Sequence, residues 1–377
     1  MTRRKQLIFA ATTVALSLTT ILALIEIALR FLPVVSGLYV LPVTEHDPIM
    51  HFQPNSSFVF SEDWDLHLVN RGHINNDGWV NDQDYVKDGP PLLAVVGASM
   101  IAALMVPYAQ TLQGRLAQAL DGKMRVYSFG VPGGPLSQYL MWAQYAVRKF
   151  GAEALIISVV SSNFDQSLLA NRVYDGFWLY EPGSDGQLNL RLIEYHPGPK
   201  QWFDKHSALA RYLSINLFLP QLIKTTVMTN WHRLRALFTG EQAVDDSYEV
   251  NGPADANISR LNESLAVTDA FFRDLPKLTG LPPDRIAFIL DGFRYPDVAA
   301  KGAGSYFDRM RGEFRKKAEA KGYEVIDMDP FFFAHFRQYH EKFEDSRDFH
   351  WNALGHSIAA DAVMSSKLPS RFLVQSR

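Results

Sequence analysis

The sequence contains no cysteine, so disulfide bonds, thiolate metal sites and cysteine nucleophiles are all excluded. It also lacks an excess of charge of one sign, because its formal net charge is only -3 over 377 residues. A basic surface of the kind that binds nucleic acid is therefore not expected. There is no internal repeat and no low-complexity tract. With 47% hydrophobic and 20% charged residues, the composition is that of a globular protein with a sizeable core.

Long hydrophobic runs are also scarce, and the only one lies near the N-terminus. Residues 7–25 are uncharged and mostly apolar, which is long enough to cross a bilayer as a helix. Basic residues at positions 3–5 favour a cytoplasmic N-terminus with the remainder exported. A cleavable signal peptide is the alternative, but no clear Ala-x-Ala site follows before Pro33. We expect residues 1–30 to be a signal anchor of a single-pass inner-membrane protein whose main domain is periplasmic or otherwise extracytoplasmic.

The rest of the chain divides by composition into two further parts. Residues 31–90 are rich in Pro, Asn, Asp and Gly, and we expect a stalk that becomes an N-terminal flap. Residues 91–377 form the main domain, with a helical insertion at about 166–256. Within that insertion, 180–186 predicts a hairpin or loop, and 207–238 predicts helix. The insertion is consistent with a lid or substrate wall, with packing alone, or with a position near the bilayer.

Strand and helix patterns alternate through the main domain. Short apolar strands are predicted at 92–97, 124–129, 154–160, 285–290 and 324–327. Helices are predicted at 111–120, 136–150, 258–275, 306–321 and 353–364. This alternation is typical of βαβ units. The fold class is therefore α/β, with a three-layer α/β/α sandwich around a central parallel sheet of about five strands.

Residues suited to acyl-transfer chemistry follow several of these strands. Ser99 follows the first strand, Gly133 lies in a turn after the second, and Asn163 comes after the third. Asp348 and His350 follow the last strand. Since the carboxyl ends of parallel strands share one edge, these residues are expected there together. A hydroxyl nucleophile needs an oriented base and donors for the developing oxyanion, and one candidate exists for each role. Taken singly, each residue has a structural alternative as a cap or a turn former.

With these motifs the chain resembles the SGNH (GDSL-type) hydrolase superfamily. The matching blocks are, in order, Gly-Ala-Ser at 97–99, Val-Pro-Gly-Gly at 131–134, Ser-Asn-Phe-Asp at 162–165, and Asp-Phe-His at 348–350 leading to Gly-His at 355–356. The resemblance covers about residues 92–368 without the insertion. The N-terminal anchor also resembles that of membrane-anchored bacterial members associated with cell-surface polysaccharide.

The resemblance implies a flavodoxin-like fold and an exported, membrane-tethered serine esterase. It implies that Ser99 attacks an ester carbonyl, that His350 takes its proton, and that Asp348 orients the imidazole. The backbone N–H groups of Ser99 and Gly133, with the side-chain amide of Asn163, would form the oxyanion hole. No cofactor and no metal are implied. The implied substrate is an acyl ester, in particular an O-acetyl group on a cell-surface glycan, and polysaccharide-assembly proteins are possible partners.

The chain departs from the family pattern in two places. Ala98 occupies the position before the nucleophile where the family usually has Asp, so the turn loses a polar anchor. The usual Asp-x-x-His becomes Asp-x-His, with Arg347 three residues before His350. His356 is a rival base, for which a structural role is favoured. Two other functions remain open: an O-acyltransferase with the same site, and a catalytically silent scaffold of a polysaccharide assembly system.

Overall fold

The computed structural model describes residues 2–160, 163–217, 219, 248–249, 252–253 and 258–373. The chain divides into two compact units. Unit 1 comprises Met1–Tyr39, Ser57–Arg71 and Pro197–Val244, and unit 2 comprises Val40–Ser56, Gly72–His196 and Asp245–Arg377. The boundaries at residues 30 and 90 remain predictions.

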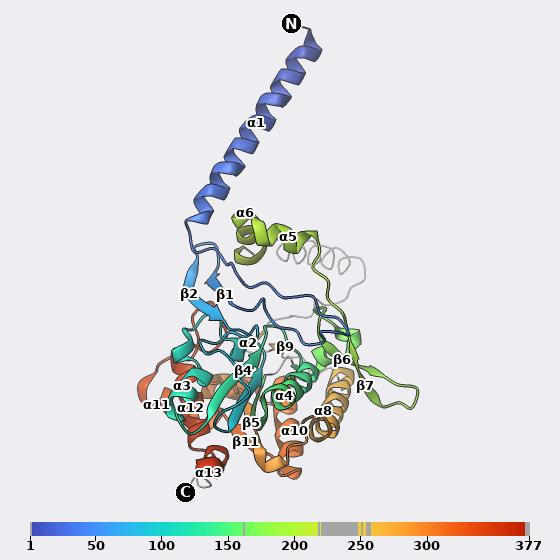
Figure 1. The fold of residues 1–377 in the computed structure, drawn as a ribbon, viewed down its shortest axis with the longest axis vertical. Helices are drawn as coiled ribbons and strands as arrows, with labels where there is room; N and C mark the ends of the chain where they lie inside the picture. The colour runs from blue at the N-terminus through green and yellow to red at the C-terminus, as the bar shows by residue number, and fades with distance from the viewer. Residues whose placement is uncertain are drawn as a thin grey trace. The chain divides into compact units, whose positions relative to one another are not determined.

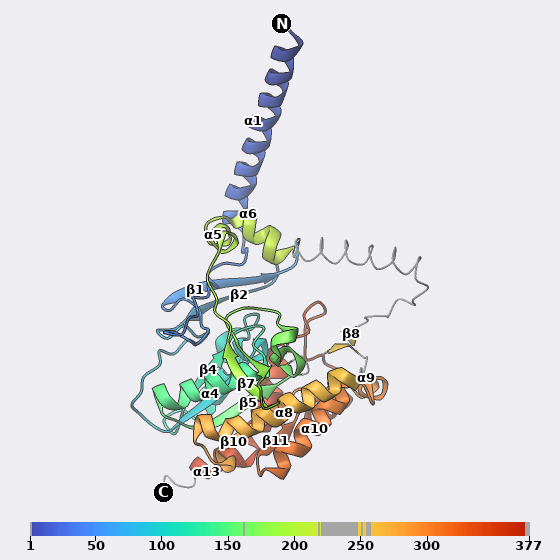
Figure 2. The same ribbon diagram turned by 90° about the vertical axis from the view of Figure 1, so that its right-hand side faces the viewer.

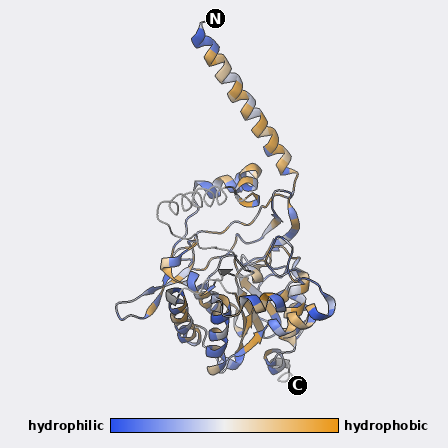
Figure 3. Ribbon diagram, turned by 180° about the vertical axis from the view of Figure 1, so that it is seen from behind, coloured by the Kyte–Doolittle hydropathy of each residue, from blue (hydrophilic) through white to orange (hydrophobic). Residues whose placement is uncertain are grey.

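Unit 1 begins with the apolar helix that the sequence predicts. Helix α1 spans Arg3–Arg30 and is apolar along most of its length (Figure 3). Among the described helices it is the one long and apolar enough to cross a membrane. The other elements with residues in unit 1 are β1 (Ser56–Glu62), β2 (His67–Ile74), α5 (Pro199–His206), α6 (Ala208–Arg211) and a π-helical turn, η5 (Tyr212–Asn216). Of the helix predicted at 207–238, the part from 208 to 216 is helical, and most of the remainder lies outside the described residues.

Unit 2 contains a five-stranded parallel sheet. Its strands are β3 (Leu92–Gly97), β4 (Arg125–Gly130), β5 (Ala152–Val159), β10 (Ile286–Leu290) and β11 (Glu324–Asp327). Across the sheet they run β11-β10-β5-β3-β4. Numbered by chain order from the β4 edge, this is 2-1-3-4-5, the flavodoxin-like doubly wound order. β3 and β10 are buried at every residue, as strands covered on both faces must be.

Helices cover both faces of the sheet, so the predicted three-layer fold is confirmed (Figure 1). One face carries α4 (Leu136–Phe150), α8 (Ile258–Thr279) and α10 (Tyr306–Ala320), and the other carries α3 (Leu112–Ala119), α11 (Asp329–Tyr339) and α12 (Ala353–Met364). The hairpin or loop predicted at 180–186 is an antiparallel hairpin, β6 (Trp178–Pro182) and β7 (Leu188–Leu192). The remaining short elements are α2 (Ser99–Ala102), η1 (Tyr108–Gln110), η3 (Asp165–Ser167), η4 (Leu169–Asn171), β8 (Tyr248–Glu249), β9 (Gly252–Pro253), η6 (Pro283–Arg285), α9 (Pro296–Gly302) and α13 (Lys367–Leu373).

Candidate active site

Ser99 is the first residue of α2, immediately beyond the carboxyl end of β3. Its neighbours Ala98 and Met100 are buried, whereas Ser99 itself is partly exposed. Gly130, at the end of β4, lies so close that an added Cβ would stand 2.5 Å from the carbonyl oxygen of Gly97. The absence of a side chain at Gly130 therefore lets the two strand ends approach. The fold delivers the Ser99 hydroxyl to the edge of the sheet.

Gly133 and Asn163 flank this position from the two neighbouring strands. β3 lies between β4, which leads to Gly133, and β5, which leads to Asn163. The winding of the sheet reverses between β3 and β5, and ligands bind open α/β sheets at such a switch point. Gly133 has φ 80°, a left-handed conformation that favours glycine, and an added Cβ would collide with the ring of Tyr174.

A buried tyrosine joins these blocks. Tyr139, on α4, donates its hydroxyl proton to Oδ1 of Asn163 at 2.9 Å. The Nδ2 of Asn163 in turn donates to the carbonyl oxygen of Gly134 at 3.1 Å. Burial raises the pKa of Tyr139 well above its ordinary value, although its hydrogen bonds with the Ala98 backbone and with the Asn163 side chain act against this rise. The hydroxyl thus stays protonated, and its hydrogen bond with the Ala98 backbone gives the turn before Ser99 a polar anchor.

Asp348 and His350 contact each other despite their two-residue spacing. The Nδ1 of His350 lies 2.5 Å from Oδ1 of Asp348, whose residue is only 4% exposed. The backbone N–H of His350 donates to the same oxygen at 3.1 Å. A carboxylate at Nδ1 favours the tautomer with its proton there and leaves Nε2 as an acceptor. Asp348 is therefore placed to orient the imidazole.

The Nε2 atom of His350 is buried and has no hydrogen-bond partner among the described residues. The hydrogen bond to the Ser99 hydroxyl is thus not formed in this structure. Catalytic hydrogen bonds are often long without substrate and tighten in the Michaelis complex. The structure brings Ser99, Gly133 and Asn163 to one edge and pairs Asp348 with His350.

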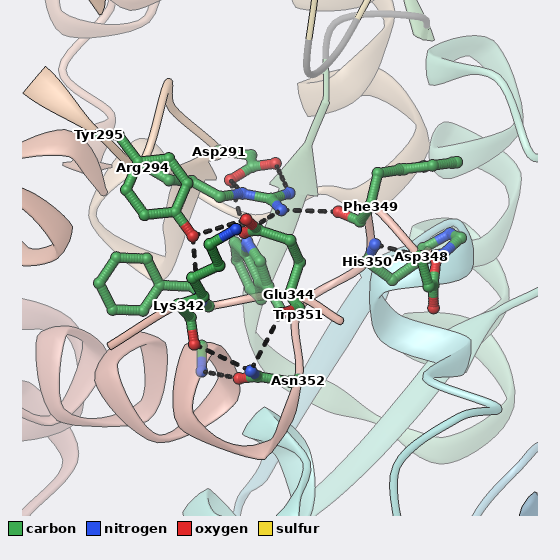
Figure 4. A network of polar contacts seen from close by, with 12 residues as sticks. Asp291, Arg294, Tyr295, Lys342, Glu344, Asp348, Phe349, His350, Trp351 and Asn352 are labelled. Carbon is green, nitrogen blue, oxygen red and sulfur yellow. Dashed lines mark hydrogen bonds and ion pairs between the residues drawn. The ribbon is translucent and has the colours of Figure 1, made fainter. Parts of the chain in front are cut away.

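A buried ion pair holds the loop that carries His350 (Figure 4). Asp291 follows β10, and its Oδ2 lies 2.7 Å from Nη2 of the fully buried Arg294. Arg294 also donates from Nη1 to the carbonyl oxygen of Phe349 at 2.6 Å. The indole N–H of Trp351 donates to Oδ1 of Asp291 at 2.9 Å. Both neighbours of His350 are therefore bound to this one ion pair.

The partly buried Glu344 completes the charge cluster around Arg294. Its Oε2 lies 3.2 Å from Nη1 of Arg294, and its Oε1 accepts the hydroxyl proton of Tyr295 at 2.5 Å. Burial lowers the pKa of Arg294, but Asp291 and Glu344 outweigh it and raise the pKa above its ordinary value. The guanidinium therefore stays charged. Sequence reasoning missed this cluster, for which the one available signal was an Asp and an Arg placed directly after a buried strand.

His356 lies on α12 and is fully buried. Its Nδ1 accepts the backbone N–H of Leu112, the first residue of α3, at 3.1 Å. Burial lowers the pKa of His356 to about 3. A neutral imidazole that satisfies a helix N–H has a structural role. Within the described part of the chain, no group of three or more His, Cys, Asp or Glu is arranged to hold a metal ion.

The buried neutral state of His356 predicts a pH dependence of stability. The unfolded chain takes up this proton near pH 6.5, whereas the folded chain resists it until about pH 3. The contribution of neutral His356 to the free energy of unfolding is therefore complete above pH 6.5 and is lost as the pH falls from 6.5 towards about 3. We expect the free energy of unfolding to drop by about 2 kcal/mol between about pH 7.5 and about pH 5. Urea unfolding should show a smaller drop for His356→Gln, and an equal drop in both proteins would contradict this assignment.

No protein-family model matches the sequence, and no curated protein does. Solved structures do match. The acetyl xylan esterase AlAXEase is 12% identical, with 73% of this chain and 98% of that chain covered and a TM-score of 0.38. A catalytic mutant of an acetylxylan esterase from Geobacillus stearothermophilus is 11% identical, with 74% and 95% covered and a TM-score of 0.37. A member of the lipolytic G-D-S-L family from Veillonella parvula is 9% identical, with 73% and 97% covered and a TM-score of 0.36. The likeness is one of fold.

Proposed function

We propose that this protein is a membrane-tethered serine esterase that cleaves acyl esters at Ser99. The observation that carries the proposal is the Asp348–His350 pair, which leaves the Nε2 of His350 buried and without a hydrogen-bond partner in the described part of the chain. That is the state of a general base before substrate binds. The order of motifs along the chain and the doubly wound sheet support the same assignment.

The proposed reaction has two steps. Ser99 Oγ attacks the ester carbonyl while its proton passes to Nε2 of His350, and the C–O bond to the alcohol breaks as that proton reaches the leaving oxygen. Water then attacks the acyl-enzyme, with His350 again taking and returning the proton, and the acid is released. The N–H groups of Ser99 and Gly133 and the Nδ2 of Asn163 would stabilise the oxyanion. Each such donor is typically worth about 2.7–4 kcal/mol in the transition state.

We propose an O-acetyl group on a cell-surface glycan as the substrate, following the resemblance to the anchored members of the superfamily. Exposed aromatic rings beside the site support a ligand with flat apolar faces, such as a sugar ring. Phe349 is 59% exposed and stacks on the His350 ring at 4.3 Å, and Tyr174 is 55% exposed beside Gly133. The apolar α1, with basic residues at its N-terminal end, supports a membrane anchor and an exported main domain.

The test is acetate release by the purified full-length protein in detergent. The expected result is release of acetate from a small aryl acetate and from an acetylated polysaccharide. Acetyl transfer to an added glycan acceptor, with little acetate released into water, would instead identify an acyltransferase with the same site. A folded protein that does neither would contradict the proposal and favour a silent scaffold.

A further inference from the structure

The C-terminal end of α1 coincides with the expected edge of the bilayer. The uncharged run at 7–25 spans about 28 Å as a helix, close to the hydrocarbon thickness of about 30 Å. Glu26 follows directly and pairs with Arg30 at 2.7 Å. These two charged residues therefore lie at the level of the lipid headgroups, on the side opposite the basic N-terminus.

The same two residues hold the helices of the insertion. The Glu26 carboxylate accepts the hydroxyl proton of Ser207 at 2.8 Å and the backbone N–H groups of Ala208 and Leu209 at 3.1 and 2.8 Å. These N–H groups belong to the first two residues of α6. The Glu26 carboxylate therefore caps the N-terminus of α6 from a different helix. Arg30 donates to the carbonyl oxygen of His206, the last residue of α5, at 3.1 Å.

Apolar packing fixes the same junction. Leu29, at the end of α1, forms a buried cluster with Val34 and Ala208. The α5–α6 segment is therefore joined to the end of α1 by both polar and apolar contacts. Figures 1 and 2 show α5 running crosswise to α1 beside this end. A helix so placed lies along the plane of a membrane that α1 crosses.

Helix α5 has the composition of an interfacial helix. Trp202 and Phe203 are 58% and 56% exposed, and their rings pack edge to face at 5.1 Å. Lys200 and Lys205 are also exposed on this helix. Aromatic rings with neighbouring lysines are typical of chains that lie in the headgroup region, since the rings bury apolar area while the ammonium groups reach phosphate and water.

We propose that α5 is an interfacial helix that inserts Trp202 and Phe203 into the headgroup layer of the bilayer that α1 spans. The proposal rests on the membrane anchor proposed above. Lipid would cover two large exposed rings, and the contacts of Glu26 and Arg30 would fix the depth of α5 in the membrane. The protein would then contact the membrane through two elements, the spanning helix α1 and the interfacial helix α5.

The absence of native cysteine permits a direct test. The full chain carrying Phe203→Cys is labelled with an environment-sensitive NBD fluorophore and placed in nanodiscs of phosphatidylcholine and phosphatidylglycerol. We expect blue-shifted emission that a spin-labelled lipid with a shallow label quenches strongly and that an aqueous quencher barely affects. Trp202→Cys should behave alike. Leu16→Cys, within α1, is the control for the anchor, and the exposed Ser365→Cys, in unit 2, is the control for water contact.

The controls separate failure of this inference from failure of the anchor. Lipid quenching at 16 but water contact at 203 would overturn the interfacial helix and leave the anchor standing. A probe at 203 that neither lipid nor aqueous quencher reaches would place this face against protein and also overturn the inference. Water contact at both 16 and 203 would remove the anchor as well.

Discussion

Replacing Ser99 by Ala is expected to lower kcat for ester hydrolysis by roughly 10⁴-fold or more. The change removes the oxygen that forms the acyl-enzyme in the proposed mechanism, and the removed atom is small enough to leave the buried neighbours Ala98 and Met100 in place. KM should change little, since the hydroxyl acts in the transition state rather than in binding the ester. Steady-state hydrolysis of an aryl acetate measures both constants.

The matched control is Ser365→Ala, which removes an exposed hydroxyl whose hydrogen bond goes to the carbonyl oxygen of Asp361. Its activity should equal that of the wild type. Activity of a folded Ser99→Ala protein within tenfold of the wild type would contradict the prediction. That outcome would mean that another group forms the acyl-enzyme or that none is formed.

Replacing Arg294 by Met is expected to destabilise the protein by about 3–5 kcal/mol, because it leaves the buried Asp291 carboxylate and the partly buried Glu344 carboxylate without their cation. It also removes the hydrogen bond to the Phe349 carbonyl, next to His350. We therefore expect kcat to fall in the fraction that remains folded, with KM less affected. Urea unfolding and aryl acetate hydrolysis measure the two effects.

Two further variants separate positioning from stability. Arg309→Met removes an exposed arginine and should change neither quantity. The double variant Asp291→Asn with Arg294→Met removes one buried charge of each sign, so part of the stability should return. Its kcat should stay low, because the Phe349 carbonyl still lacks its donor. Full recovery of kcat together with stability would contradict a positioning role for Arg294.

Much of the sheet and its helices is predictable because the main domain has local and unambiguous periodicity. The strand predicted at 324–327 and the helix predicted at 136–150 coincide with β11 and α4. The antiparallel pair β1 and β2 was not predicted, because turn-forming residues around it favour irregular structure. Helix α11 was also missed, since its aromatic residues have only modest helix propensity and its packing decides its form.

The parts of the site at strand ends can be predicted from the sequence, whereas the parts that depend on the path of a loop cannot. Ser99 and Asn163 can be placed from sequence because each lies within a few residues of the end of a buried strand, and the sheet brings strand ends together. The pairing of Asp348 with His350 depends on the path of a loop, which the spacing alone does not determine. Arg294 could not be assigned, because its partner carbonyl lies 55 residues further along the chain.

Labelling with a fluorophosphonate probe tests the central claim most directly, because the probe reacts with an activated serine whatever the natural substrate is. We expect the wild-type protein to be labelled, and both Ser99→Ala and His350→Ala to lose the label while remaining folded. No labelling of a folded wild-type protein, or labelling that persists in Ser99→Ala, would contradict the assignment of Ser99 as the nucleophile.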